Sequence, residues 1–222
     1  MLTKEQWIAN LSTINQSVEL YPAEKELIIL NQPTGDFFYD PWVLKEEYKN
    51  TVWEELLSSL PYAAGEARVI RLLPGESYMA HADIDDRWHL NLTGEYCYLI
   101  DLNENTMYQL VKDGHWYSMD AGKIHVASNF GSIYRYQLVV RMPLLATKEK
   151  KLTSVSIEPA SEQKDYRYKF DNIISPYLNK INKEFKMKDF KFQGQVVSFK
   201  LATSELKNLK SLINNDFKVT YA

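Results

Sequence analysis

The pattern of apolar and polar positions changes twice along the chain. Residues 26–30 are predicted to form a short buried strand, and residues 41–60 carry aromatic and aliphatic side chains at near-helical spacing up to Pro61. From residue 67 to residue 142, short segments rich in Val, Ile, Tyr and Leu alternate with turn signals, which recur about every 8–12 residues. This rhythm is typical of an antiparallel sandwich or barrel.

The middle region contains eight short predicted strands. They span residues 67–73, 77–82, 88–93, 96–101, 106–111, 115–119, 124–128 and 134–141. Eight such strands favour a double-stranded β-helix, the jelly-roll core of cupin-like proteins. The predicted fold class is therefore mainly β, with this core preceded by an N-terminal helix.

The pattern changes again after Thr147. Residues 148–151 are predicted to be a polar linker, followed by alternating strands and helices at residues 152–157, 163–185, 196–201, 204–214 and 217–221. This β-α-β-α-β order predicts a small α+β unit, packed on the barrel or tethered to it. We therefore expect two domains: residues 1–146, the β-helix with its N-terminal helical flank, and residues 147–222, a C-terminal unit of unknown role.

Charge is distributed unevenly between these two parts. The chain of 222 residues has a net charge of -3, to which residues 1–146 contribute -9 and residues 147–222 contribute +6. The basic part interleaves 15 Lys and Arg residues with nine acids and contains no nucleic-acid-binding motif. A solubilising surface is therefore the better interpretation, and nucleic acid is disfavoured as a partner.

The composition also limits where the chain is expected to reside. No apolar run approaches the roughly 18 residues that a membrane-spanning helix needs, and the N-terminus has no basic stretch followed by an apolar block. The single cysteine, Cys97, cannot form an internal disulfide and is most simply a small buried residue. We expect a cytoplasmic protein with no membrane partner.

The first candidate for chemistry is the pair His81 and Asp83. Residues i and i+2 of a strand point to the same face, so both side chains can bind one metal ion. Chance alone would give roughly 0.2 such pairs in this composition, so the pair decides little by itself. A second histidine, His125, falls on a later predicted strand and completes the two-histidine, one-carboxylate set of non-haem Fe(II) oxygenases.

The second candidate is Arg135, in the predicted strand 134–141. Strand position alone favours a solvent-facing arginine. If the side chain points inward, its burial is costly unless an anion meets it. A planar guanidinium suits bidentate capture of a carboxylate, so a dicarboxylate that also chelates the metal would explain both candidates.

Several of these segments, taken in order, resemble one known family. They are residues 67–83, Arg87 to Leu92 (Arg-Trp-His-Leu-Asn-Leu), residues 125–129 and residues 135–139. Together, over about residues 65–142, they look like the aspartyl/asparaginyl β-hydroxylase family and its proline cis-4-hydroxylase-like relatives. The members of this family are double-stranded β-helix oxygenases that depend on Fe(II) and 2-oxoglutarate.

The resemblance implies roles for individual residues. It implies that His81, Asp83 and His125 hold iron and that Arg135 pairs with the far carboxylate of 2-oxoglutarate. It also implies that two further residues help to position the cosubstrate, namely Arg87 and His89.

The chain also departs from the family pattern. The family often has His and Asp after the arginine, where this chain has Gln137 and Arg141, so the contacts at these positions stay open. The C-terminal unit has no recognised counterpart.

Other polar and aromatic residues carry weaker signals. Asp85 and Asp86 follow the metal motif and are expected to be solvated loop acids, although they could meet a cationic substrate group. His115 is expected to lie at an edge strand or turn. Trp88 and Trp116 could either line a pocket or pack in the core.

The resemblance implies an Fe(II)- and 2-oxoglutarate-dependent dioxygenase. It would use O2 to hydroxylate a C–H bond of an amino acid, or of an Asp, Asn or Pro side chain in a peptide or protein. Two alternatives remain open: a cupin-type metal-dependent isomerase or lyase, and a non-catalytic ligand-binding jelly-roll.

Overall fold

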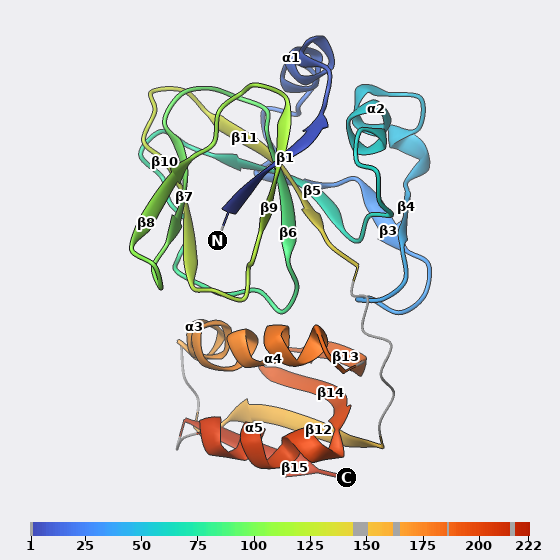
Figure 1. Cartoon of the computed structure of the whole chain (residues 1–222), viewed down its shortest axis with the longest axis vertical. Coiled ribbons are helices and arrows are strands. Elements are labelled where there is room, and N and C mark those ends of the chain that lie inside the picture. Colours follow the sequence, from blue (N-terminus) through green and yellow to red (C-terminus); the bar gives the residue numbers. More distant parts are fainter. Residues whose placement is uncertain (1, 144–150, 162–164, 186, 214–215) are drawn as a thin grey trace.

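The computed structural model describes residues 2–143, 151–161, 165–185, 187–213 and 216–222. Figure 1 shows a β-rich part above a smaller part built of strands and helices. The predicted boundary between residues 146 and 147 and most of the predicted linker lie outside the described residues, so the division into two domains stays a prediction. Within the described ranges, no helix is long and apolar enough to cross a membrane.

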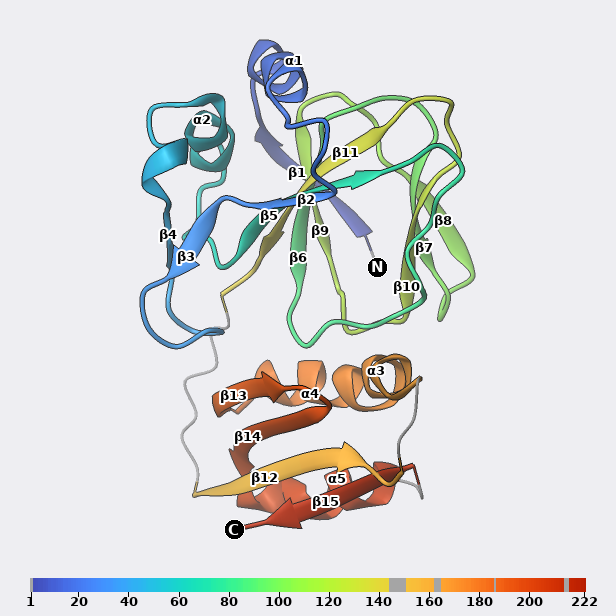
Figure 2. The same ribbon diagram turned by 180° about the vertical axis from the view of Figure 1, so that it is seen from behind.

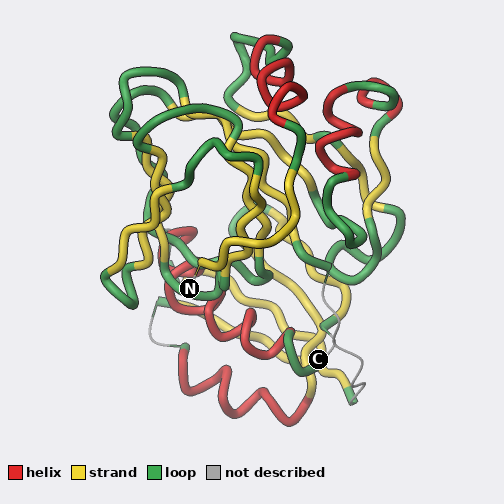
Figure 3. The backbone as a smooth tube through the Cα atoms, turned by 45° about the horizontal axis from the view of Figure 1, so that its top comes forward, coloured by secondary structure: helices red, strands yellow, loops and turns green. Residues whose placement is uncertain are grey.

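The β-rich part consists mainly of two antiparallel sheets that form a double-stranded β-helix (Figure 3). The larger sheet has six strands in the order β1-β9-β6-β11-β5-β2, and the smaller has three in the order β10-β7-β8. The predicted fold class is confirmed. The larger sheet comprises β1 (Leu2–Ile8), β2 (Leu27–Ile29), β5 (Ala67–Leu72), β6 (Arg87–Asn91), β9 (His115–Met119) and β11 (Arg135–Arg141). The smaller comprises β7 (Cys97–Asp101), β8 (Thr106–Gln109) and β10 (His125–Asn129).

Strand β11 lies inside the larger sheet, and all seven of its residues are buried. Its side chains alternate between the two faces of the sheet. Tyr136, Leu138 and Val140 join the main apolar core, whereas Arg135 and Gln137 line a cavity inside the β-helix. One face of the strand therefore stabilises the fold, and the other presents polar groups to an internal site.

The N-terminal flank differs from its prediction. Helix α2 covers only Val52–Ser58, and its N-cap, Thr51, accepts a hydrogen bond from the Trp53 amide. Before it, β4 (Trp42–Leu44) pairs with β3 (Asn31–Pro33), and a 3-10 turn, η1, spans Glu46–Tyr48. The prediction of one helix over residues 41–60 was wrong in its first half because Asn50, at φ 56°, interrupts the helix before the cap.

Besides β3 and β4, two further N-terminal elements were not predicted. They are β1 and helix α1 (Leu11–Glu19), whose N-cap side chain, Asn10, accepts from the Ser12 amide. The side chains of β1 are largely exposed or half-buried, which weakens the hydrophobic signal of an edge strand.

Residues 77–82, predicted as a strand, form no continuous strand. Two isolated bridges join this segment to β10, one between Ser77 and Ser128 and one between His81 and His125. The Tyr78 amide still donates to the Ala127 carbonyl of β10, but the Ala80 carbonyl and the Ala82 amide bond instead to Asn172 and Asp171 in the C-terminal part of the chain.

The C-terminal unit is an antiparallel sheet with helices on one face, as the two opposite views show (Figures 1 and 2). The order of its strands is β13-β14-β12-β15, and their apolar side chains share a core with the helices. Every predicted element is present in its described residues, and β13 is additional. The strands are β12 (Leu152–Pro159), β13 (Lys188–Gln193), β14 (Val196–Ala202) and β15 (Phe217–Tyr221). The helical elements are α3 (Tyr166–Lys169), the π-helical turn η2 (Phe170–Ile174), α4 (Ser175–Asn182), the 3-10 turn η3 (Thr203–Glu205) and α5 (Leu206–Leu212).

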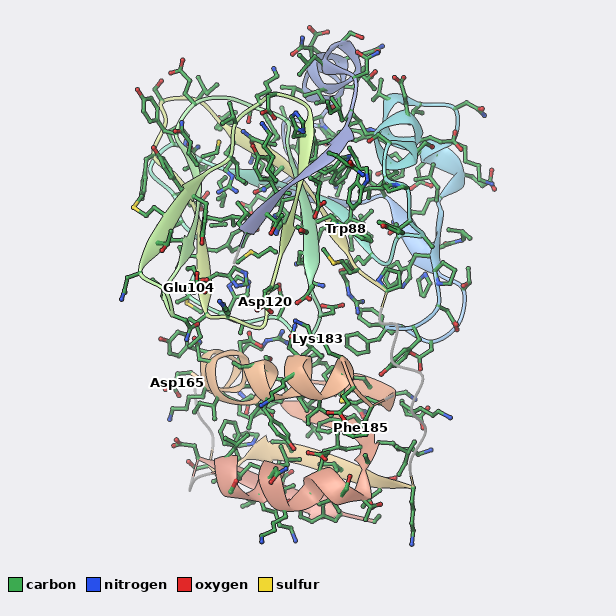
Figure 4. The ribbon with its side chains drawn as sticks, viewed as in Figure 1. Trp88, Glu104, Asp120, Asp165, Lys183 and Phe185 are labelled. Atoms are coloured by element: carbon green, nitrogen blue, oxygen red, sulfur yellow. The ribbon has the colours of Figure 1, made fainter. Side chains whose placement is uncertain are left out.

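The C-terminal unit packs against one end of the β-helix through α3, η2 and α4 (Figure 1). Nζ of Lys183 lies 2.9 Å from a carboxylate oxygen of Asp86 and 2.9 Å from one of Asp120. Figure 4 labels Lys183 and Asp120 on the two sides of this junction. The Asn179 amide also donates to Asp86 at 3.2 Å. Polar contacts thus hold the unit over the segment that carries the candidate metal ligands.

Candidate metal centre

The structure brings the three predicted metal ligands together. One ligand atom from each of His81, Asp83 and His125 lies within 4.8 Å of the other two. His125 is the first residue of β10, and its backbone N–H donates to the carbonyl of His81 at 2.9 Å while the return bond is 3.1 Å. This backbone pairing places the two imidazole rings 4.5 Å apart.

Both histidines are oriented by backbone carbonyl groups. Nδ1 of His81 lies 2.8 Å from the carbonyl oxygen of Met79, and Nδ1 of His125 lies 2.8 Å from that of Lys123. Because a carbonyl only accepts, each Nδ1 donates, which leaves the Nε2 of each ring as the atom able to bind a metal ion. A metal-binding imidazole is commonly held in this way.

Asp83 is held as a carboxylate. Burial raises its pKa, but coulombic interactions with the surrounding basic groups, that with Arg87 the largest, more than offset this, so the pKa lies well below its usual range. Arg87 Nη2 lies 3.1 Å from Oδ1 of Asp83, whereas Oδ2 lies 3.9 Å from Nε2 of His125. Burial lowers the pKa of His125, which keeps that ring neutral and able to bind a cation.

An internal cavity of about 130 Å³ adjoins these three residues and is also lined by Arg135. Arg135 is only 1% exposed. Its Nη1 donates to the carbonyls of Tyr98 at 3.0 Å and Ser128 at 2.9 Å, and its Nη2 donates to the Gln137 side chain. Among the described residues, it has no acidic partner, and its Nε has no hydrogen-bond acceptor. Burial lowers its pKa to about 10, so the guanidinium stays charged at neutral pH.

Gln137 connects Arg135 to His89. Its Oε1 accepts from Arg135, and its Nε2 donates to Nδ1 of His89 at 3.1 Å. Nε2 of His89 therefore carries the proton, and this buried donor has no partner among the described residues. Burial, followed by coulombic interactions with the basic groups His125 and Arg135, holds the pKa of His89 well below its usual value. At this end, the cavity thus has a cationic group and a neutral donor, whereas the Asp83 carboxylate that also lines the cavity lies among the metal ligands and pairs with Arg87.

A second buried cluster surrounds Asp85, which is 1% exposed. Arg87 donates to one of its oxygens and Arg141 to the other. The expectation that Asp85 is a solvated loop acid was wrong, because two buried guanidinium groups neutralise it. Asp86 is also not free in solvent, since it bonds to Asn179 and Lys183 of the C-terminal unit.

The two residues implied to position the cosubstrate both line the internal cavity, but they differ in their bonding partners. His89 lines the internal cavity, and Arg87 lines it while bonded to Asp83 and Asp85. Their roles toward a cosubstrate stay predictions. Gln137 was noted in the sequence only as a departure from a pattern. Gln137 lies two residues after Arg135 in the same strand, so strand periodicity could have placed both side chains on the face that lines the cavity.

A larger cleft of about 660 Å³ reaches His81 and Asp83 from outside. One wall belongs to the β-helix part of the chain, and the other belongs to the C-terminal unit. The first wall includes Phe37, Phe38, Glu66, Arg68, Asp85, Arg87 and Arg141. The second includes Arg167, Asp171, Ser175, Phe190, Lys191, Phe192 and Gln193.

The remaining candidates lie away from this centre. Nδ1 of His115 bonds to the Glu5 carbonyl at 2.8 Å, where β9 meets β1. Trp88 and Trp116 are core residues, and Cys97 is buried.

Comparisons with known proteins add little to this geometry. The sequence matches no protein-family model and no curated protein. Among solved structures, it is similar to a cupin domain from Bordetella pertussis Tohama I, at 17% identity and a TM-score of 0.32, over 37% of this chain and 84% of that chain. A likeness at this level carries no weight, and the fold assignment depends on the strand order described above. The motif resemblance to the aspartyl/asparaginyl β-hydroxylases stays a prediction.

Proposed function

We propose that this protein is an Fe(II)- and 2-oxoglutarate-dependent dioxygenase. Its reaction would hydroxylate a C–H bond of an amino acid, or of an Asp, Asn or Pro side chain in a peptide or protein. The observation that carries the proposal is one shared cavity, in which His81, Asp83 and His125 face the same space as a buried Arg135 that has no acidic partner among the described residues.

The three ligand residues fit a divalent iron. Two neutral imidazole nitrogens and one carboxylate, with further coordination positions left open, form the donor set of non-haem Fe(II) oxygenases. The donor set contains no thiolate, which disfavours a structural zinc site. Iron bound by His81, Asp83 and His125 would supply the activation of O2 and the oxidising power of the reaction.

The cavity residues fit a dicarboxylate such as 2-oxoglutarate. Arg135 offers a buried positive charge and an unpaired Nε, and His89 offers an unpaired Nε2–H. A carboxylate at this end would satisfy both donors and offset the cost of burying the guanidinium. The other end of a short dicarboxylate would face the metal ligands.

The larger cleft fits the prime substrate. It reaches His81 and Asp83 from outside, and charges of both signs line it next to phenylalanine rings. An amino acid or peptidyl group carries an amine or amide, a carboxylate or carbonyl, and a side chain, which complement such a surface. In this arrangement, the walls exclude water and orient the substrate, while Arg87 fixes the Asp83 carboxylate.

The test is succinate release by full-length protein supplied with Fe(II), 2-oxoglutarate and O2. A pooled library of amino acids and peptides should stimulate it, and mass spectrometry should find a product heavier by one oxygen. Asp83→Ala should lower the basal and stimulated rates by orders of magnitude, whereas Asp113→Ala, which removes a half-buried acid paired with Lys4, is the matched control. Metal binding without any succinate, together with an O2-independent reaction on a sugar, would instead support the isomerase alternative.

A further inference from the structure

The segment that carries His81 and Asp83 has backbone groups that the β-helix does not satisfy. The His81 amide donates to the His125 carbonyl at 3.1 Å, and the Asp83 amide donates to the Ala121 carbonyl at 2.7 Å. The amide between them, on Ala82, points the other way and donates to the carbonyl of Asp171 at 3.0 Å. Ala82 is buried, so without that acceptor its N–H would lack a partner at considerable cost.

A second bond from the C-terminal unit holds the same segment. The side-chain amide of Asn172 donates to the carbonyl of Ala80 at 3.0 Å and to the carbonyl of Tyr168 at 2.8 Å. Asp171 and Asn172 are adjacent, so one short stretch of helix binds the residues on both sides of His81.

The local sequence explains why the Asp171 carbonyl is available. These residues belong to the π-helical turn η2, in which the Ser175 amide donates to the Phe170 carbonyl, five residues back. In an α-helix, the same amide would have bonded to Asp171. The following residue is Pro176, which has no N–H to offer. The π turn and the proline together leave the Asp171 carbonyl free of its usual helical partner, as often occurs at functional sites.

We propose that Asp171 and Asn172 are positioning residues for the metal centre, so that the C-terminal unit sets the affinity of His81 and Asp83 for a divalent cation. This inference rests on the proposed metal site. The two residues act through the backbone of residues 80–82 and do not bind the ion. Groups that orient metal ligands typically change metal affinity by about 10–100-fold when removed.

The test compares Mn(II) binding by wild type, Asn172→Leu and Asn208→Leu, measured by calorimetry on the full chain. Asn172→Leu keeps similar bulk but removes the donor, and we expect Mn(II) to bind about tenfold more weakly. Asn208 is a matched control, because its amide donates to Glu205 at 3.1 Å on the exposed side of the same unit. Asn208→Leu should bind Mn(II) like the wild type.

Amide hydrogen exchange provides a second measurement. Exchange at Ala82 should become faster in Asn172→Leu. It should also become faster in Pro176→Ala, which gives the helix an N–H able to compete for the Asp171 carbonyl. If Asn172→Leu only destabilised the C-terminal unit, amide exchange would instead become faster throughout the core of that unit. If Asn172→Leu fails to fold, the result for Pro176→Ala decides the question.

The two proposals can fail separately. Equal Mn(II) affinity and unchanged Ala82 exchange in folded variants would overturn the positioning role and leave the proposed function standing. Wild-type protein that binds Mn(II) no better than His125→Ala would overturn the metal centre, and with it both proposals.

Discussion

Arg135 and Arg141 lie at the two ends of β11, on the same face of the sheet, and both are buried. Their surroundings are opposite in character. Arg141 shares Asp85 with Arg87, and its guanidinium lies 4.0 Å from the centre of the Phe37 ring and 4.5 Å from that of Phe38. Among the described residues, Arg135 bonds only to carbonyl oxygens and to the neutral side chain of Gln137.

The difference separates a structural charge from one available to a ligand. A buried guanidinium is tolerated when an acid and further hydrogen bonds compensate its desolvation. The chain provides this for Arg87 and Arg141, but among its described residues it provides no acid for Arg135. The charge of Arg135 beside a cavity therefore marks a site for an external anion.

The largest effect that this comparison predicts is on stability. Asp85→Ala would leave the buried Arg141 without its bonded acid and Arg87 with Asp83 alone, so we expect the free energy of unfolding to fall by about 3–5 kcal/mol. Urea denaturation followed by tryptophan fluorescence measures it. Asp113→Ala, which breaks the exposed pair with Lys4, should cost much less. A small loss in both variants would show that Asp85 does not neutralise the arginines.

The second effect is on ligand binding. Arg135→Met keeps the bulk of the side chain and removes its charge, so 2-oxoglutarate binding should weaken by about 2–4 kcal/mol. The free energy of unfolding should not fall, because an uncompensated buried charge is replaced by an apolar group. Calorimetry with Mn(II) present measures the binding, and Arg71→Met, outside the internal cavity, is the control. If metal and 2-oxoglutarate affinities fell together, Arg135 would be structural.

The sequence was sufficient to predict the features that follow strand periodicity. His81 and Asp83 are two residues apart and face one site, although they do not lie in a continuous strand. The i, i+2 spacing of this pair requires no knowledge of distant residues. For Arg135, strand position alone favoured a solvent-facing side chain, and this was wrong: the side chain points inward, as the dicarboxylate hypothesis requires.

Features that depend on distant partners could not be predicted. Asp85 and Asp86 are neighbours in the sequence, and the local pattern does not show that Asp85 is buried against Arg141, which lies 56 residues later. The bond from Asn172 to Ala80 spans 92 residues, and its acceptor is a backbone carbonyl with no sequence signature. The tertiary fold decides these pairings, not the local pattern.

The smallest effect concerns pH and the end of the cavity that holds Arg135 and His89. Burial holds the pKa of His89 well below 6.5, so protonation would add a second positive charge near Arg135. Below pH 6.5, the unfolded chain binds a proton that folded His89 does not, and stability must therefore fall as pH falls. The slope for one such group approaches about 1.4 kcal/mol per pH unit. Burial lowers the pKa of His125 as well, so His89→Gln should remove only part of the loss of stability at acid pH.

We therefore expect the free energy of unfolding of metal-free protein, measured by urea denaturation, to fall between pH 6.5 and 5.5. The fall should be smaller in His89→Gln than in wild type by about 1 kcal/mol. Above pH 7, both states of the wild type hold His89 neutral, so its stability and that of the variant should run parallel there. Equal losses in both proteins at acid pH would mean that His89 is protonated in the folded state. The cavity would then tolerate a second cation beside Arg135, contrary to the distinction drawn between the two ends of β11.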